Sequence, residues 1–154
     1  MQSIKASPKR LPRQAMSPNL AATIQPAKDA AKRLKRRSGR FEIYGLLEQI
    51  YRIYREWKRL GVANRSARML ADEISTTRRK GMSAIRVLVE ATLPDADFKQ
   101  KSRWVRALEY VYSEDVPARE FERFIRAHRG LAGCARLAAQ ANRKRRLPGG
   151  DWYD

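Results

Sequence analysis

The chain has 154 residues, and because domains usually hold about 100 to 200 residues, one compact domain with a tail is expected. Its 34 Lys and Arg residues outnumber 16 Asp and Glu residues, and the net charge of +18 favours polyanionic partners, nucleic acid first and an anionic membrane surface second. Cys134 is the only cysteine, which excludes an intrachain disulfide and favours a reducing compartment, and no stretch approaches the roughly 18 consecutive apolar residues of a membrane span.

The N-terminal segment is the most basic part of the chain. Residues 1–40 hold 11 Lys and Arg residues against one acid, Asp29, so this segment carries +10 and the other 114 residues carry +8. Four prolines and no sustained apolar period predict a disordered basic arm over residues 1–38, because the segment buries too little apolar surface to offset its ordering entropy. A short helix from Pro26 to Arg37 is expected only against a partner, and a solubilising tail is the alternative interpretation. The arm residues predicted to contact nucleic acid are Lys32, Arg33, Lys35, Arg36 and Arg37.

Beyond the arm, apolar residues recur with helical periodicity. The strongest pattern begins at Phe41, has its inward face from Ile43 to Leu60, and predicts a helix that ends at Gly61. Its aromatic residues are interpreted as core. Its polar face pairs Glu48 with Arg52 at i, i+4 spacing.

Two shorter helices are predicted next. Asn64 is the expected N-cap of a helix that reaches Ile74, and Ser83 is the expected N-cap of a helix that ends at Pro94. Apolar side chains around the second of these helices predict that it is the central helix of the domain. The turn between them is basic, and the start of the second helix favours a bound phosphate there. The residues of this turn predicted to bind nucleic acid are Arg78, Arg79 and Lys80.

These two helices and their turn loosely resemble a helix-turn-helix motif over about 25 residues. In such a motif the second helix enters the major groove of DNA. This chain departs from the pattern in two respects. The connection from Ser75 to Gly81 is longer than the usual turn of about three or four residues, and Arg86 is the only strongly polar residue that could read bases. The motif is a hypothesis, and no family is inferred from it.

A fourth helix is predicted with either Asp95 or Asp97 as its N-cap, the latter with Gln100 as its capping-box partner. At about 100° per residue, one of its faces is basic and the opposite face, with Phe98 and Trp104 expected to point inward, is apolar. The basic face predicts contact with a phosphate backbone or a major groove, because Arg makes bidentate contacts with phosphate and guanine. A solvated helix face is the alternative. The predicted binding residues are Lys99, Arg103, Arg106 and Tyr110.

Two further helices complete the pattern. Pro117 is expected in the first turn of the fifth, and Gly130 separates the fifth from the sixth. The sixth helix ends in a basic cluster, and residues 147–154 are predicted to be a flexible tail. The cluster, like the arm, is suited to backbone contacts that provide affinity without sequence information. Its predicted binding residues are Arg143, Lys144, Arg145 and Arg146.

The sequence contains no recognisable catalytic motif. His128 and Cys134 lie six positions apart without the further residues of a zinc site or a thiol protease, and both are interpreted as structural. Acidic residues around the start of the fifth helix are interpreted as capping groups. The protein is therefore not expected to be an enzyme, and no cofactor, metal or small-molecule substrate is expected.

The prediction is an all-α protein, a compact bundle of about five to six helices over residues 39–146 with a disordered basic arm. Its expected function is that of a DNA-binding regulatory or accessory protein, for example in transcription, in the cytoplasm or at the nucleoid. An RNA-binding or ribosome-associated protein and an interaction protein that binds an acidic protein partner are the alternatives. Import into an organelle is a minor alternative, since the prolines interrupt the helix of a transit peptide.

Overall fold

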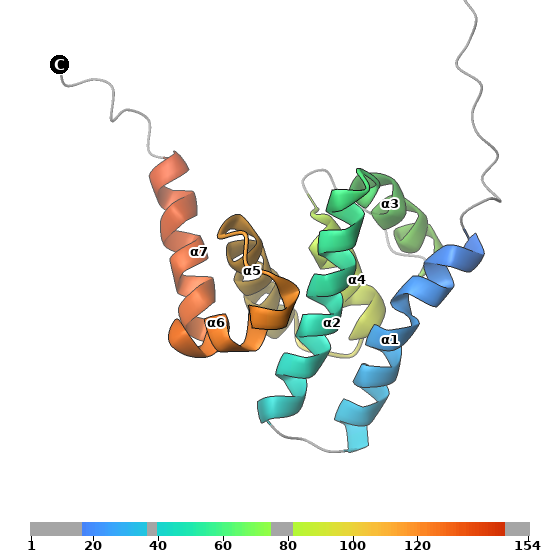
Figure 1. The fold of residues 1–154 in the computed structure, drawn as a ribbon, viewed down its shortest axis with the longest axis horizontal. Coiled ribbons are helices and arrows are strands. Elements are labelled where there is room, and N and C mark those ends of the chain that lie inside the picture. Colours follow the sequence, from blue (N-terminus) through green and yellow to red (C-terminus); the bar gives the residue numbers. More distant parts are fainter. Residues whose placement is uncertain (1–16, 37–39, 75–81, 147–154) are drawn as a thin grey trace, which may run out of the picture.

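The computed structural model describes residues 17–36, 40–74 and 82–146. Within these ranges the chain forms seven α-helices, one short 3₁₀ turn and no strand, which confirms the predicted all-α class (Figure 1). The elements are α1 (Ser17–Arg36), α2 (Arg40–Arg59), α3 (Ala63–Glu73), α4 (Ala84–Thr92), α5 (Phe98–Ser113), the 3₁₀ turn η2 (Ala118–Glu120), α6 (Phe121–Ala127) and α7 (Gly130–Arg146).

Helix α1 shortens the predicted arm, because residues 17–36 are helical and packed. The side chains of Leu20, Ile24, Ala27 and Ala31 recur at i, i+4, i+7 and i+11 and are buried, mainly against α2. The helix predicted in this region needs a partner to pack against, and the rest of the same chain, mainly α2, is that partner. Pro26 is tolerated inside α1 because it lies on the exposed side, where water can satisfy the carbonyl left without an N–H donor. Residues 1–16 lie outside the described residues.

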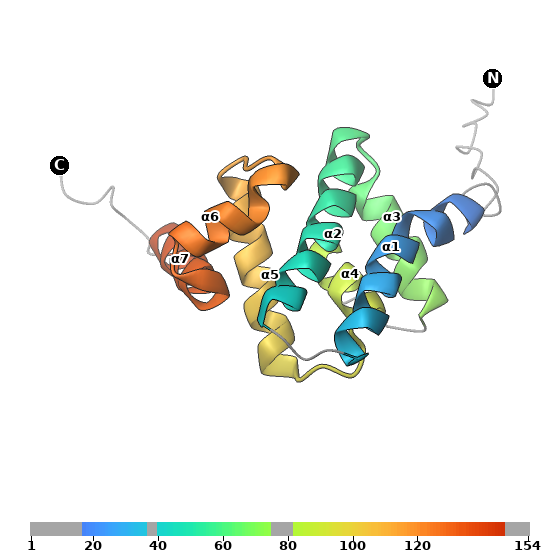
Figure 2. The ribbon, with the colours of Figure 1, turned by 60° about the horizontal axis from the view of Figure 1, so that its bottom comes forward.

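Helix α2 runs through the middle of the bundle, with α1 on one side and α5 and α6 on the other (Figure 2). Helix α4, predicted to be the central helix, packs against α1, α2, α3 and α5, but α2 packs against α1, α3, α4, α5 and α6 and is the more central of the two. Helices α5 and α7 share the largest interface between any two described helices. The largest fully buried aliphatic side chains of this core are Ile24, Leu46, Leu47, Ile50, Leu70, Ile85, Leu88, Leu108 and Ile125.

Local signals set several helix ends as predicted. The Ser83 hydroxyl accepts a hydrogen bond from the N–H of Arg86 at 3.2 Å, and the Asp97 carboxylate accepts two at the start of α5. Gly61 follows α2 with a φ of 70°, the left-handed conformation that favours glycine. The prediction that Asn64 caps α3 is wrong, because the helix begins at Ala63, directly after the turn at Gly61.

Two large apolar residues expected in the core are exposed. Leu60 lies beyond the last turn of α2 and is 55% exposed, and Phe98 is the first residue of α5 and is 71% exposed. Helical periodicity gives the face on which a residue lies, but the residue is buried only where a neighbouring element covers that face. Phe98 instead lies 4.7 Å from the guanidinium carbon of Arg86, measured to its ring centroid.

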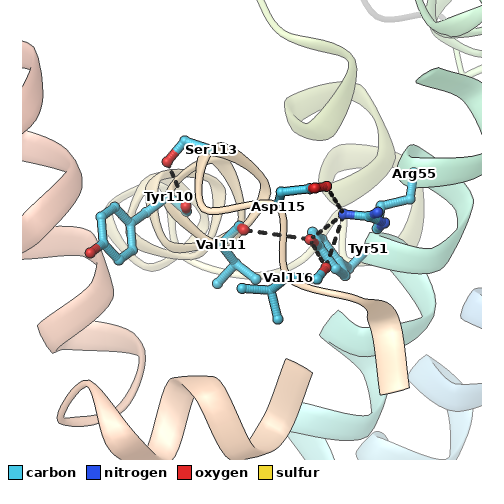
Figure 3. Close-up of polar contacts among 7 residues, drawn as sticks. All are labelled: Tyr51, Arg55, Tyr110, Val111, Ser113, Asp115 and Val116. Carbon is cyan, nitrogen blue, oxygen red and sulfur yellow. Dashed lines mark hydrogen bonds and ion pairs between the residues drawn. The ribbon is translucent and has the colours of Figure 1, made fainter. Parts of the chain in front are cut away.

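A polar network fastens the turn after α5 to α2 (Figure 3). The buried hydroxyl of Tyr51 donates to the carbonyl oxygen of Val116 at 2.5 Å. Arg55 donates to the same carbonyl at 3.0 Å and to the carboxylate of Asp115 at 3.2 Å. Burial raises the pKa of Tyr51, so its hydroxyl remains a donor at neutral pH. The network holds α5 at a fixed position across the bundle, which matters because α5 carries the candidate interface.

Candidate nucleic-acid interface

The outer face of α5 carries exposed cations that have no acidic partner. Lys99, Arg103 and Arg106 follow one another at i, i+4 and i+7 and are exposed. Among the described residues, none of the three forms an ion pair. We call these three residues the α5 ridge. They are free to exchange water and counterions for phosphate groups.

Tyr110 continues the same helix face but is not a free aromatic side chain. It is half-buried, and its ring centroid lies 6.0 Å from that of Phe124 and 6.2 Å from that of His128. Burial raises its pKa. Tyr110, predicted to bind nucleic acid beside the ridge, therefore mainly packs α6 onto α5.

The cations on the inner side of α5 and on α4 are already held by contacts within the protein. Lys101 is 7% exposed and donates to Glu90 at 2.8 Å and to the carbonyl of Pro94 at 2.9 Å. Arg86 donates to Glu90 at 3.2 Å and to Ser102 at 2.8 Å. These contacts clamp α5 against α4 and leave neither cation for a ligand.

The same contacts argue against the helix-turn-helix hypothesis. Helix α4 would be the recognition helix, yet most of its residues are buried in the core. Arg86, the residue that would have to read bases, is engaged within the protein. A helix covered on most of its circumference cannot enter a major groove.

A cleft brings α1 and α5 together, which the sequence did not indicate. It has a volume of about 1010 Å³ and is formed by α1, the start of α2, the α4–α5 turn, α5 and the start of α7. Lys32, predicted as an arm residue, and Arg103 of the α5 ridge both line it. Sequence reasoning missed two further cations of the lining, Lys28 and Arg129. The i, i+4 spacing of Lys28 and Lys32 was the available signal, whereas nothing local marks Arg129.

The other predicted binding residues are only partly described. Arg33 is exposed on α1, and Arg143, Lys144 and Arg145 are exposed near the end of α7. The 17-residue length of α7 places its basic end about 24 Å from the start of that helix, which lines the cleft. Lys35, Arg36 and Arg146 belong to helices, but their side chains are not described, and Arg37, Arg78, Arg79 and Lys80 lie outside the described residues.

His128 and Cys134 both take up packing positions. The His128 ring stacks on Phe124 with centroids 3.9 Å apart, and its Nδ1 lies 2.7 Å from the Phe124 carbonyl oxygen. Cys134 is fully buried, and burial raises the pKa of its thiol to about 11, so the thiolate needed for nucleophilic attack is scarce at neutral pH. Across residues 17–36, 40–74 and 82–146, no three potential ligands gather as a metal site would require.

None of the described helices is both long enough and apolar enough to cross a membrane. Comparison of the chain with known protein families, with curated proteins and with solved structures found no match. The physical properties of the described surface are therefore the basis for a functional proposal.

Proposed function

We propose that the protein binds nucleic acid, with duplex DNA as the favoured partner, through the α5 ridge. The observation that supports this proposal is the row of three exposed cations without acidic partners on one rigid helix. Arg103 and Arg106 can each make bidentate contacts with phosphate, and Lys99 adds a third positive charge on the same face. The net charge of +18 attracts the nucleic acid from a distance. The α5 ridge then provides ordered contacts with its phosphates.

A matched pair of double variants tests the proposal. The ridge variant carries Arg103→Gln and Arg106→Gln, and the control carries Arg52→Gln and Arg59→Gln on α2, where both arginines are paired with glutamates. Each double change removes two positive charges and keeps good helix propensity. Fluorescence anisotropy with a labelled blunt duplex measures Kd, and a thermal unfolding curve checks the fold.

We expect the ridge variant to bind at least tenfold more weakly than the control, a difference of about 1.4 kcal/mol. The slope of log K against log salt should decrease by about 0.9 for each phosphate that the variant no longer neutralises. Equal weakening in the two variants would show diffuse electrostatic adhesion and would contradict the proposal. Tighter binding of an RNA duplex of the same length would move the assignment to RNA.

A further inference from the structure

The cleft between α1, α2, α5 and α7 shares Arg103 with the α5 ridge but differs from it chemically. Its wall is largely apolar, with half-buried Leu34, Ile43, Leu93 and Leu131 among its lining residues. Its volume of about 1010 Å³ lies at the upper end of the range of ligand pockets. A concave apolar surface of this size can cover a flat or aliphatic group that a purely ionic surface would leave in water.

Positive charge surrounds this apolar wall. Lys28, Lys32, Arg103 and Arg129 line the cleft from α1, α5 and the corner before α7, and none of them forms an ion pair within the described part of the chain. Asp95 is the one acid of the lining, and it has a partner within the protein. Four cations against one acid favour a ligand with at least one phosphate group.

We infer that the cleft holds an unpaired nucleotide of the bound nucleic acid, with its phosphate among the four cations and its base over the apolar wall. A blunt duplex keeps its bases stacked inside a convex rod, so it can offer the cleft only phosphates at the rim. An unpaired nucleotide offers a phosphate and a base face together, which matches both parts of the lining. This inference rests on the proposed nucleic-acid binding and specifies the form of nucleic acid that the protein prefers.

The test compares a blunt duplex with the same duplex carrying a five-nucleotide 3′ thymidine overhang, in competition anisotropy at constant salt. We expect the overhang to improve binding about tenfold. Ala132→Trp fills the cleft from α7 without changing its charge, because Ala132 is an exposed lining residue. Ala22→Trp on α1 is the matched control, since Ala22 is also exposed but does not line the cleft.

We expect Ala132→Trp to abolish the preference for the overhang and to keep the affinity for the blunt duplex, whereas Ala22→Trp keeps both. The double variant Lys28→Gln with Lys32→Gln provides a second route if the tryptophan perturbs folding, and it should reduce the preference to less than about twofold. Thermal unfolding of each variant separates a blocked cleft from a damaged fold.

Three outcomes would overturn the inference. Equal affinity of the wild-type protein for the two duplexes would leave the proposed function intact and remove the role of the cleft. An overhang preference that survives in both cleft variants would place the unpaired nucleotides elsewhere. More effective displacement by an acidic, leucine-rich peptide than by a thymidine oligonucleotide of the same length would assign the cleft to an acidic protein segment. Absence of binding to either duplex at low salt would instead remove the proposed function itself.

Discussion

Helices α2 and α5 both present basic residues to solvent, but they differ in what accompanies the charge. On α2, Arg52 donates to Glu48 at 3.1 Å, and Arg59 donates to Glu56 at 2.6 Å. On α5, Lys99, Arg103 and Arg106 form no ion pair among the described residues. The difference arises from sequence spacing, because α2 places glutamates three or four residues before its arginines and the ridge does not.

This difference shows that the number of Lys and Arg residues on a helix does not give the amount of unpaired positive charge that it presents. An exposed ion pair contributes only about 0 to 1 kcal/mol, so breaking it costs a ligand little. The larger effect is that each glutamate repels an approaching phosphate and cancels the field of its arginine. A row of unpaired cations keeps its full electrostatic field. The changes below alter the difference in unpaired charge between α2 and α5, or the fold that supports it.

The largest expected effect concerns α1, which supplies Lys28 and Lys32 to the cleft beside α5. Deleting residues 1–36 removes the buried side chains of Leu20 and Ile24 and exposes the surface of α2 that they cover. We expect the free energy of unfolding, measured by urea titration, to fall by at least about 5 kcal/mol. Deleting only residues 1–16 is the control and should change it by less than about 1 kcal/mol. Similar curves for the two deletions would mean that α1 does not belong to the folded domain.

The inner side of α5 should respond through stability rather than binding. Trp104 is 6% exposed, and Trp104→Ala should lower the free energy of unfolding by about 3 to 5 kcal/mol. At temperatures below the new unfolding midpoint, the Kd for the blunt duplex, whose bases do not enter the cleft that Trp104 helps to line, should change by less than about threefold. A stable variant with weakened binding would instead make Trp104 part of the interface.

Giving α5 the pairing pattern of α2 should weaken binding directly. Lys99→Glu places a glutamate four residues before Arg103, the orientation that favours an ion pair on a helix. We expect more than about a tenfold increase in Kd for the blunt duplex, compared with about fivefold for Lys99→Gln. If the two substitutions have the same effect, pairing is irrelevant and only the removal of the lysine matters.

The reverse change on α2 should have the smallest effect. Glu48→Gln with Glu56→Gln frees Arg52 and Arg59, and the removal of these two exposed ion pairs should leave the thermal unfolding midpoint almost unchanged. The Kd for duplex DNA should improve by less than about threefold, because these arginines lie on a different helix from the ridge. An improvement beyond tenfold would show that any exposed arginine row on this protein suffices.

The sequence predicts the parts of this fold that depend on local signals. The caps at Ser83 and Asp97 and the stop at Gly61 each involve residues within about one turn, so their spacing identifies them. Helix α1 is harder to predict because its buried face combines two large apolar residues with alanines, and because Pro26 has the character of a helix breaker. Alanines bury little area, but they allow two helices to approach closely, which apolar periodicity undervalues.

The candidate site likewise has one part that the sequence predicts and one part that it does not. The α5 ridge follows from helical geometry alone, since all three residues lie on one helix and their spacing is visible in the sequence. The cleft joins Lys32 to Arg103 and Arg129, which are distant in the sequence and meet only after α1, α5 and α7 have packed. The ion pair between Lys101 and Glu90 could not be predicted from local spacing either, because it joins two separate helices across a turn.

The pairs of helices that pack together affect how fast the chain folds. Helix α1 packs on α2, α3 on α4 and α4 on α5, so many tertiary contacts join segments adjacent in the sequence. Short loops are closed at little entropic cost, and helical proteins with such local topology fold in about microseconds to milliseconds. The protein should therefore refold mainly in a fast phase after dilution from denaturant, with a slower minor phase from unfolded chains that hold a cis bond before one of the seven prolines.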